Sequence, residues 1–140
     1  LNLVALRFGN QFFEGLWNRN DIAQVQIIFK ENLGTGGRGG YFDKFGIIRD
    51  IMQNHLLQVL LWLAMEPPSS LRAADIQKEK CKLLKAVRTL SLEDCFLGQF
   101  IGNTWTEGGQ DRCELGYLED ETVPAGSRCP TYAAVALSID

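Results

Sequence analysis

The chain has 140 residues, with 14 Lys and Arg against 17 Asp and Glu, and a formal net charge of −3 at pH 7. Its basic residues are scattered, which argues against a nucleic-acid surface or an anionic membrane surface, because both need clustered positive charge. The length suits one ordinary domain.

The first part of the chain is expected to form a helix and then a strand. Apolar residues recur at helical spacing over Leu1–Trp17, and the polar run Asn18–Asp21 breaks that pattern. Over Gln24–Lys30 every second residue is apolar, which predicts a half-buried strand that ends at Glu31.

A glycine-rich stretch and a long helix are expected next. Glycines crowd Gly34–Gly40, and apolar spacing from about Ile47 to Met65 predicts a helix that Glu66-Pro67-Pro68 stops. Six polar residues interrupt this apolar stretch, which are too many for a segment that crosses a bilayer.

The second half is expected to hold another helix and two strands. One of the serines at positions 69 and 70 should cap the helix, whose charged side chains, Glu79 among them, form a solvated face. Strands are predicted at Phe96–Ile101 and Tyr132–Ile139, with a polar loop over Gly102–Gly116 between them.

The order of these elements predicts an α+β fold. The predicted helices and strands do not follow a repeated strand-helix-strand order, which favours a mostly antiparallel sheet with helices packed on one face. Leu1 opens directly into a helical pattern and the last residues fall at the edge of a strand. We therefore expect residues 1–140 to be part of a domain that is truncated at both ends.

The glycine-rich stretch allows two interpretations. Gly34–Gly39 matches the pattern GxGxxG of dinucleotide-binding turns, between a predicted strand and a predicted helix. However, Gly40–Lys44 separates the last glycine from the expected helix, and the position where an acid should follow falls inside that helix. The pattern therefore favours a tight turn over a nucleotide site.

The cysteines do not indicate a metal site. Four cysteines lie far apart, without a CxxC pair, and the chain has one histidine. This spacing argues against zinc and favours reduced thiols over disulfides.

His55 is the one side chain whose ordinary pKa, about 6.5, suits proton transfer near neutral pH. Its neighbours on an α-helix are apolar, so a packed core histidine is the alternative interpretation. Asp50 precedes it by five residues, about 140° away around an α-helix, so the two need not meet. Asp50 also suits a helix N-terminus, and Glu31 suits an exposed strand edge.

One long segment resembles the glucose-6-phosphate dehydrogenases. GRGGYFDKFGIIRDIMQNHLLQ (Gly37–Gln58) is similar to that family's characteristic segment almost without interruption. The resemblance continues in LRFGN, WNRNDIA, GQFIG, GYLEDETVPAGS and TYAAVAL, and so spans nearly the whole chain.

The resemblance implies an activity and a role for three residues. The family transfers hydride from C1 of glucose 6-phosphate to NADP, giving 6-phosphogluconolactone in the first step of the oxidative pentose phosphate pathway. It implies that His55 is the catalytic base that takes the C1 hydroxyl proton, and that Glu31 and Asp50 hold sugar hydroxyls.

The resemblance also implies parts and partners that lie elsewhere. The family's N-terminal Rossmann domain, which binds NADP, and its phosphate-gripping segment R-I-D-H-Y-L-G-K are not in these 140 residues. A homodimer or homotetramer is implied, in the cytoplasm or alternatively in a plastid. Two rival functions are a binding or regulatory module that has lost catalysis, and an autonomous nucleotide-binding protein that uses Gly34–Gly39.

Overall fold

The computed structural model describes residues 2–140 and divides them into two compact units. The first unit comprises the residues up to Phe29, then His55–Thr89 and Leu137–Asp140. The second comprises Lys30–Asn54 and Leu90–Ala136. The start of the predicted helix at Leu1 lies outside the described residues. Among those residues, no helix is long and apolar enough to cross a membrane.

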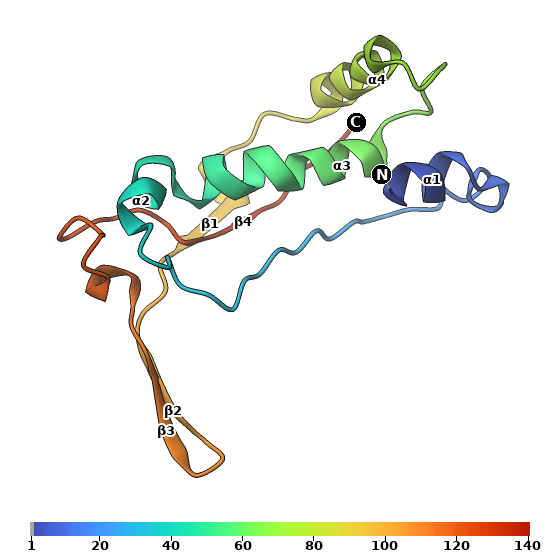
Figure 1. Cartoon of the computed structure of the whole chain (residues 1–140). Coiled ribbons are helices and arrows are strands. Elements are labelled where there is room, and N and C mark those ends of the chain that lie inside the picture. The colour runs from blue at the N-terminus through green and yellow to red at the C-terminus, as the bar shows by residue number, and fades with distance from the viewer. Residues whose placement is uncertain (1) are drawn as a thin grey trace. The chain divides into compact units, whose positions relative to one another are not determined.

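The first unit is built from helices. It contains α1 (Asn2–Phe8), the 3-10 turn η1 (Gln11–Phe13), α3 (Leu57–Ala64) and α4 (Ala73–Ala86) (Figure 1). Helix α3 ends before Glu66-Pro67-Pro68 as predicted, because proline removes a backbone donor and restricts the residue before it.

The core of this unit lies between α3 and α4. Leu61, Met65 and Leu83 are buried, and Met65 has no exposed surface. Five half-buried side chains complete the packing: Phe8, Leu57, Trp62, Ala64 and Ile76. Burial of these apolar groups is the main favourable term that holds the two helices together.

Side chains from the N-terminal segment satisfy the end of α3. The last four carbonyl groups of an α-helix have no partner within the helix. Arg7 Nη1 donates to Trp62 O at 3.0 Å, and Trp17 Nε1 donates to Leu63 O at 2.8 Å. The region that begins at α1 is thereby tied to the helix that follows His55.

The second unit combines helical segments with short antiparallel strands. Its helical segments are α2 (Gly39–Ile47), most of the π-helix η2 (Ile48–Leu56), and the 3-10 turns η3 (Leu92–Asp94) and η4 (Tyr117–Glu119). Strand β1 (Cys95–Gly98) pairs with β4 (Tyr132–Val135), and β2 (Asn103–Glu107) pairs with β3 (Gln110–Glu114). The predicted α+β class with antiparallel pairing is confirmed.

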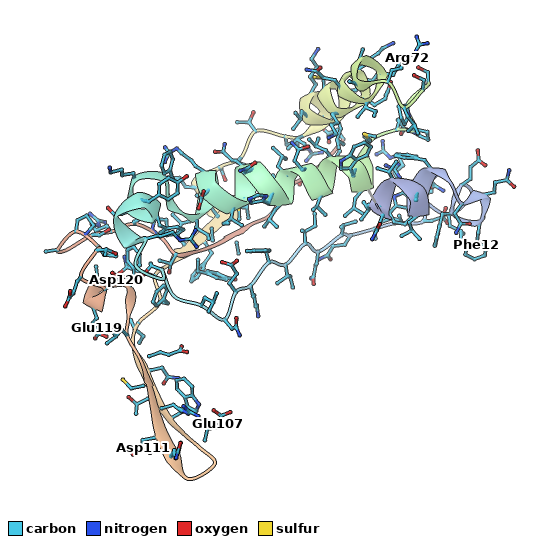
Figure 2. All side chains as sticks on the ribbon, in the orientation of Figure 1. Phe12, Arg72, Glu107, Asp111, Glu119 and Asp120 are labelled. Atoms are coloured by element: carbon cyan, nitrogen blue, oxygen red, sulfur yellow. The ribbon has the colours of Figure 1, made fainter. Side chains whose placement is uncertain are left out.

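The hairpin β2–β3 was predicted as a polar loop, and that prediction is wrong. Gly108 and Gly109 join the strands with φ of 61° and 79°, which suits the tight turn that matches strand twist. Glu107 and Asp111 lie on either side of this turn (Figure 2). The sequence signal was the Gly-Gly pair itself, but the polar residues on both faces of the hairpin concealed the strand period.

Three other predictions, all for the first third of the chain, are wrong. The first helix ends at Phe8, and Asn10 caps the next turn by accepting a hydrogen bond from Phe12 N at 3.2 Å. Gln24–Lys30 is not a strand, because no paired strand for it exists among residues 2–140 and a lone strand leaves its backbone groups unpaired. Helix α2 begins at Gly39, well before the expected start near Ile47.

The start of α4 also differs from the prediction. Its N-cap is Arg72, which makes no capping bond with its side chain, and neither serine takes that position. Ser70 Oγ instead donates to the Asp75 carboxylate at 2.5 Å and accepts from Arg72 N at 3.2 Å. The hydroxyl therefore orders the turn before the helix.

Glu79 on α4 is buried, where a solvated position was expected. It shares a helix face with Ile76 and Leu83, which pack into the core. Its Oε1 accepts from Lys82 Nζ at 2.7 Å, while Oε2 has no partner among the described residues.

Strands β1 and β4 are shorter than predicted. Strand β1 starts one residue early and ends at Gly98, and β4 ends at Val135, with a single further bridge between Val87 and Ile139. The pairing register runs from Cys95 opposite Val135 to Gly98 opposite Tyr132.

We expect Gly39→Ala to lower the free energy of unfolding by about 1–3 kcal/mol. A Cβ at Gly39 would lie 2.4 Å from Val123 Cγ2 and 2.7 Å from Thr122 Oγ1, far inside normal contact. Gly34→Ala is the matched control, because nothing lies within 4 Å of its Cβ position. Urea unfolding of the two variants beside the wild type measures the difference. Equal stability of the two variants would contradict this packing.

Candidate active site

The helix that carries Asp50 and His55 starts at a sharp backbone break. Gly46 has φ 69° and ψ 165°, a conformation that favours glycine because it has no Cβ. Immediately after it, Ile47 N donates to Pro130 O at 3.3 Å, and η2 begins at Ile48. The break sets where the π-helix begins.

The π-helix changes which side chains share a face. In a π-helix each N–H bonds to the carbonyl five residues earlier, so residues five apart lie about one turn above each other. Asp50 and His55 both belong to η2. The predicted separation of about 140° rested on α-helical geometry, which does not apply to a π-helix.

The three predicted site residues lie in different places. His55 belongs to the first unit and is exposed, so the alternative of a packed core histidine is wrong. Asp50, in the second unit, is half-buried and lies in the first turn of η2. Glu31, also in the second unit, is exposed and follows a segment without strand pairing. Within residues 2–140, none of the three side chains is held by a hydrogen bond or an ion pair.

The glycine-rich stretch is a turn packed against the segment after η4. Gly36 and Gly37 have positive φ, and Arg38 N donates to Thr35 O at 3.0 Å. Thr35 Oγ1 donates to the carboxylate of Asp120, which Figure 2 labels next to Glu119.

The amide that opens α2 already has a partner. Gly39 N donates to Thr122 Oγ1 at 2.9 Å. A nucleotide site of the GxGxxG type needs the helix N-terminal amides free to meet phosphate. This contact supports the tight turn over a nucleotide site at Gly34–Gly39.

A polar cluster, missed by the sequence analysis, lies beside the start of η2. We call Asp43, Tyr117 and Ser127 the Asp43 cluster. Asp43 Oδ1 accepts from Tyr117 Oη at 2.9 Å and from Ser127 Oγ. Burial and the hydrogen bond to Asp43 raise the pKa of Tyr117, so it remains a neutral donor. These residues lie in YFDKFG and GYLEDETVPAGS, segments that carry the resemblance but had no assigned role.

The four cysteines are free thiols. Cys81 and Cys113 are exposed, whereas Cys95 and Cys129 are half-buried. Within residues 2–140, no group of three or more His, Cys, Asp and Glu side chains is arranged to hold a metal ion.

Comparison with known proteins decides the family. The sequence model described as "Glucose-6-phosphate dehydrogenase, C-terminal domain" matches residues 4–140. The chain belongs to this family. The resemblance found in the sequence is thereby confirmed.

The relatives carry consistent names. Glucose-6-phosphate 1-dehydrogenase of Drosophila yakuba is 54% identical over 99% of this chain and 26% of the relative. The chloroplastic glucose-6-phosphate 1-dehydrogenase of Solanum tuberosum is 55% identical over 99% of this chain and 23% of the relative. The chain thus spans about a quarter of the length of these curated relatives.

Solved structures agree in fold. A structure of glucose-6-phosphate dehydrogenase in complex with its substrate glucose-6-phosphate has a TM-score of 0.83 and 47% identity, covering 99% of this chain and 27% of that one. The glucose-6-phosphate 1-dehydrogenase of Mycobacterium avium has the same TM-score at 36% identity, covering 99% of this chain and 28% of that one.

We expect Cys129 to react with iodoacetamide at pH 8 at least about tenfold more slowly than Cys113. Burial raises the pKa of the Cys129 thiol, which lowers its thiolate fraction at that pH, and its side chain is half-buried. Timed labelling followed by peptide mass spectrometry gives both rates. Raising the pH should reduce the difference between the two labelling rates, because more of the Cys129 thiol becomes thiolate. Equal rates at pH 8 would contradict the packed position of Cys129.

Proposed function

We propose that this chain is part of an enzyme that oxidises D-glucose 6-phosphate to 6-phosphogluconolactone with NADP, the first step of the oxidative pentose phosphate pathway. The observation that carries the proposal is the family match over residues 4–140. The names of the relatives support it, and so does the similar solved structure that holds glucose-6-phosphate as its substrate.

The proposed role of the chain is part of the substrate-binding, C-terminal domain. The relatives are about four times as long as this chain, which leaves room for an N-terminal domain that holds most of the NADP. The occupied amide of Gly39 supports a nucleotide site outside the glycine-rich turn. The chain alone is not expected to be active.

His55 is proposed as the catalytic base. Oxidation at C1 breaks the C1–H bond, and its electron pair leaves as hydride to the nicotinamide ring. The C1 hydroxyl loses its proton to His55 as the oxygen forms the carbonyl bond, so charge and atoms balance. The exposed side chain of His55 supports this role, because a base must reach the hydroxyl.

Asp50 and Glu31 are proposed to orient the sugar. A carboxylate accepts hydrogen bonds from several hydroxyl groups and so selects which face of the ring meets the cofactor. Neither carboxylate is engaged by another described side chain, which leaves both free to accept. Asp50 lies half-buried in the first turn of η2, which supports a role as one ligand of the sugar.

The assembly and compartment follow from the same proposal. We propose a homodimer or homotetramer of the full-length protein, located in the cytoplasm. Relatives named as chloroplastic make a plastid the alternative location.

In the full-length protein, His55→Ala should lower kcat for NADP reduction by at least about 10²-fold, the low end for loss of a positioned base. NADPH formation with glucose 6-phosphate is the measurement. Gln77→Ala is the control, since Gln77 is exposed on α4 in the same unit as His55. Wild-type turnover in His55→Ala would remove this residue from the mechanism, and an inactive wild type would favour a binding module.

Asp50→Ala and Glu31→Ala should each raise KM for glucose 6-phosphate by at least about tenfold, because each removes a charged hydrogen-bond acceptor for a sugar hydroxyl. KM for NADP should change by less than about twofold, since neither residue is assigned to the nucleotide. Steady-state kinetics with each substrate varied in turn separates these effects. A larger rise in KM for NADP than for the sugar phosphate would exclude the assigned role.

A further inference from the structure

The Asp43 cluster joins three segments of the second unit. Asp43 lies on α2, Tyr117 opens η4, and Ser127 lies in the loop before β4. The two hydroxyl groups donate to the same carboxylate oxygen of Asp43, from positions 74 and 84 residues further along the chain. Hydrogen bonds to an ionised acceptor are stronger than those between neutral groups.

The donor side chains are themselves fixed. Tyr117 has no exposed surface, and the rings of Phe42 and Phe100 meet its ring edge-on at centroid distances of 6.0 and 5.8 Å. Gln99 Nε2 donates to Ser127 O at 3.2 Å and to Cys129 O at 2.9 Å. Cys129 N donates to Ser127 Oγ at 3.1 Å. The two hydroxyls therefore present a rigid pair of donors.

Asp43 lies close to the start of η2 along the chain. Asp43 lies three residues before the break at Gly46, and Ile47 N is bound to Pro130 O at 3.3 Å on the far side of it. Asp50 follows three residues later, in the first turn of η2. Contacts on both sides of the break thus fix the backbone that carries Asp50.

We propose that Asp43 is a positioning residue, which holds Asp50 in register for the sugar through the paired hydroxyls of Tyr117 and Ser127. This role rests on the proposed function. It gives the segments YFDKFG and GYLEDETVPAGS a shared task, because each supplies part of the cluster. Asp43 touches no reacting atom and acts through Asp50.

The test uses Tyr117→Phe in the full-length protein, which removes one donor and keeps the buried ring. KM for glucose 6-phosphate should rise about tenfold, while KM for NADP stays within about twofold. Tyr132→Phe is the matched control, because Tyr132 is exposed on β4 of the same unit and its hydroxyl makes no hydrogen bond among the described residues. An unchanged KM for the sugar phosphate, or an equal rise for both substrates, would overturn the proposal.

A double variant separates positioning from general loss of structure. If Tyr117 acts through Asp50, then Tyr117→Phe should change KM for glucose 6-phosphate by less than about twofold in an Asp50→Ala background. The same fold-change in both backgrounds would overturn the proposal. Ser127→Ala repeats the comparison from the other donor if Tyr117→Phe does not fold. Asp43→Asn, which keeps an acceptor oxygen, should restore part of the loss seen in Asp43→Ala.

Hydrogen exchange separates failure of this proposal from failure of the proposed function. Amides of Ile48–Asp50 should exchange faster in Tyr117→Phe than in Tyr132→Phe, whatever the enzyme's substrate. Faster exchange in a protein that does not oxidise glucose 6-phosphate would refute the proposed function, and with it the role in sugar binding. Unchanged exchange in an active enzyme with normal sugar KM would refute the Asp43 proposal alone.

Discussion

The second unit depends on one carboxylate that receives two hydroxyl hydrogen bonds from distant parts of the chain. Asp43 ties α2 to η4 and to the loop before β4, around the fully buried ring of Tyr117. The unit has short strands and few fully buried side chains. Apolar burial alone therefore does little to fix how its segments are arranged. Hydrogen bonds to a partly buried carboxylate fix this arrangement, because their distances and angles allow few other placements of the donor groups.

The break at Gly46 and the π-helix after it determine the backbone geometry of the segment that carries the proposed site residues. A regular α-helix from α2 to α3 would separate Asp50 from His55 by about 140° around the axis. The segment Ile48–Leu56 is a π-helix, so this α-helical separation does not apply to it. Such turns are rare and are frequently found at functional sites.

The glycine-rich stretch shows how one pattern serves two different structures. GxGxxG describes a phosphate-binding turn when the helix amides remain free, but here Thr122 occupies the amide of Gly39. Close packing against Thr122 and Val123 accounts for the glycine at position 39, and positive φ accounts for those at positions 36 and 37. The sequence favoured the tight turn partly because a helix was expected only near Ile47, but α2 begins at Gly39. The contact between Gly39 and Thr122 is therefore the observation that supports the turn.

The sequence by itself determined the family, the α+β class and the proline end of α3, because these follow from a long matching segment and from local backbone restrictions. It missed the hairpin β2–β3, the early start of α2 and the burial of Glu79, and it predicted a strand over Gln24–Lys30 that is not formed. Those features depend on what lies opposite each residue, as strand pairing and burial always do. Only the tertiary structure decided that η2 is a π-helix and that Asp43 meets Tyr117 and Ser127, since the periodicity of a sequence cannot reveal contacts between segments so far apart along the chain.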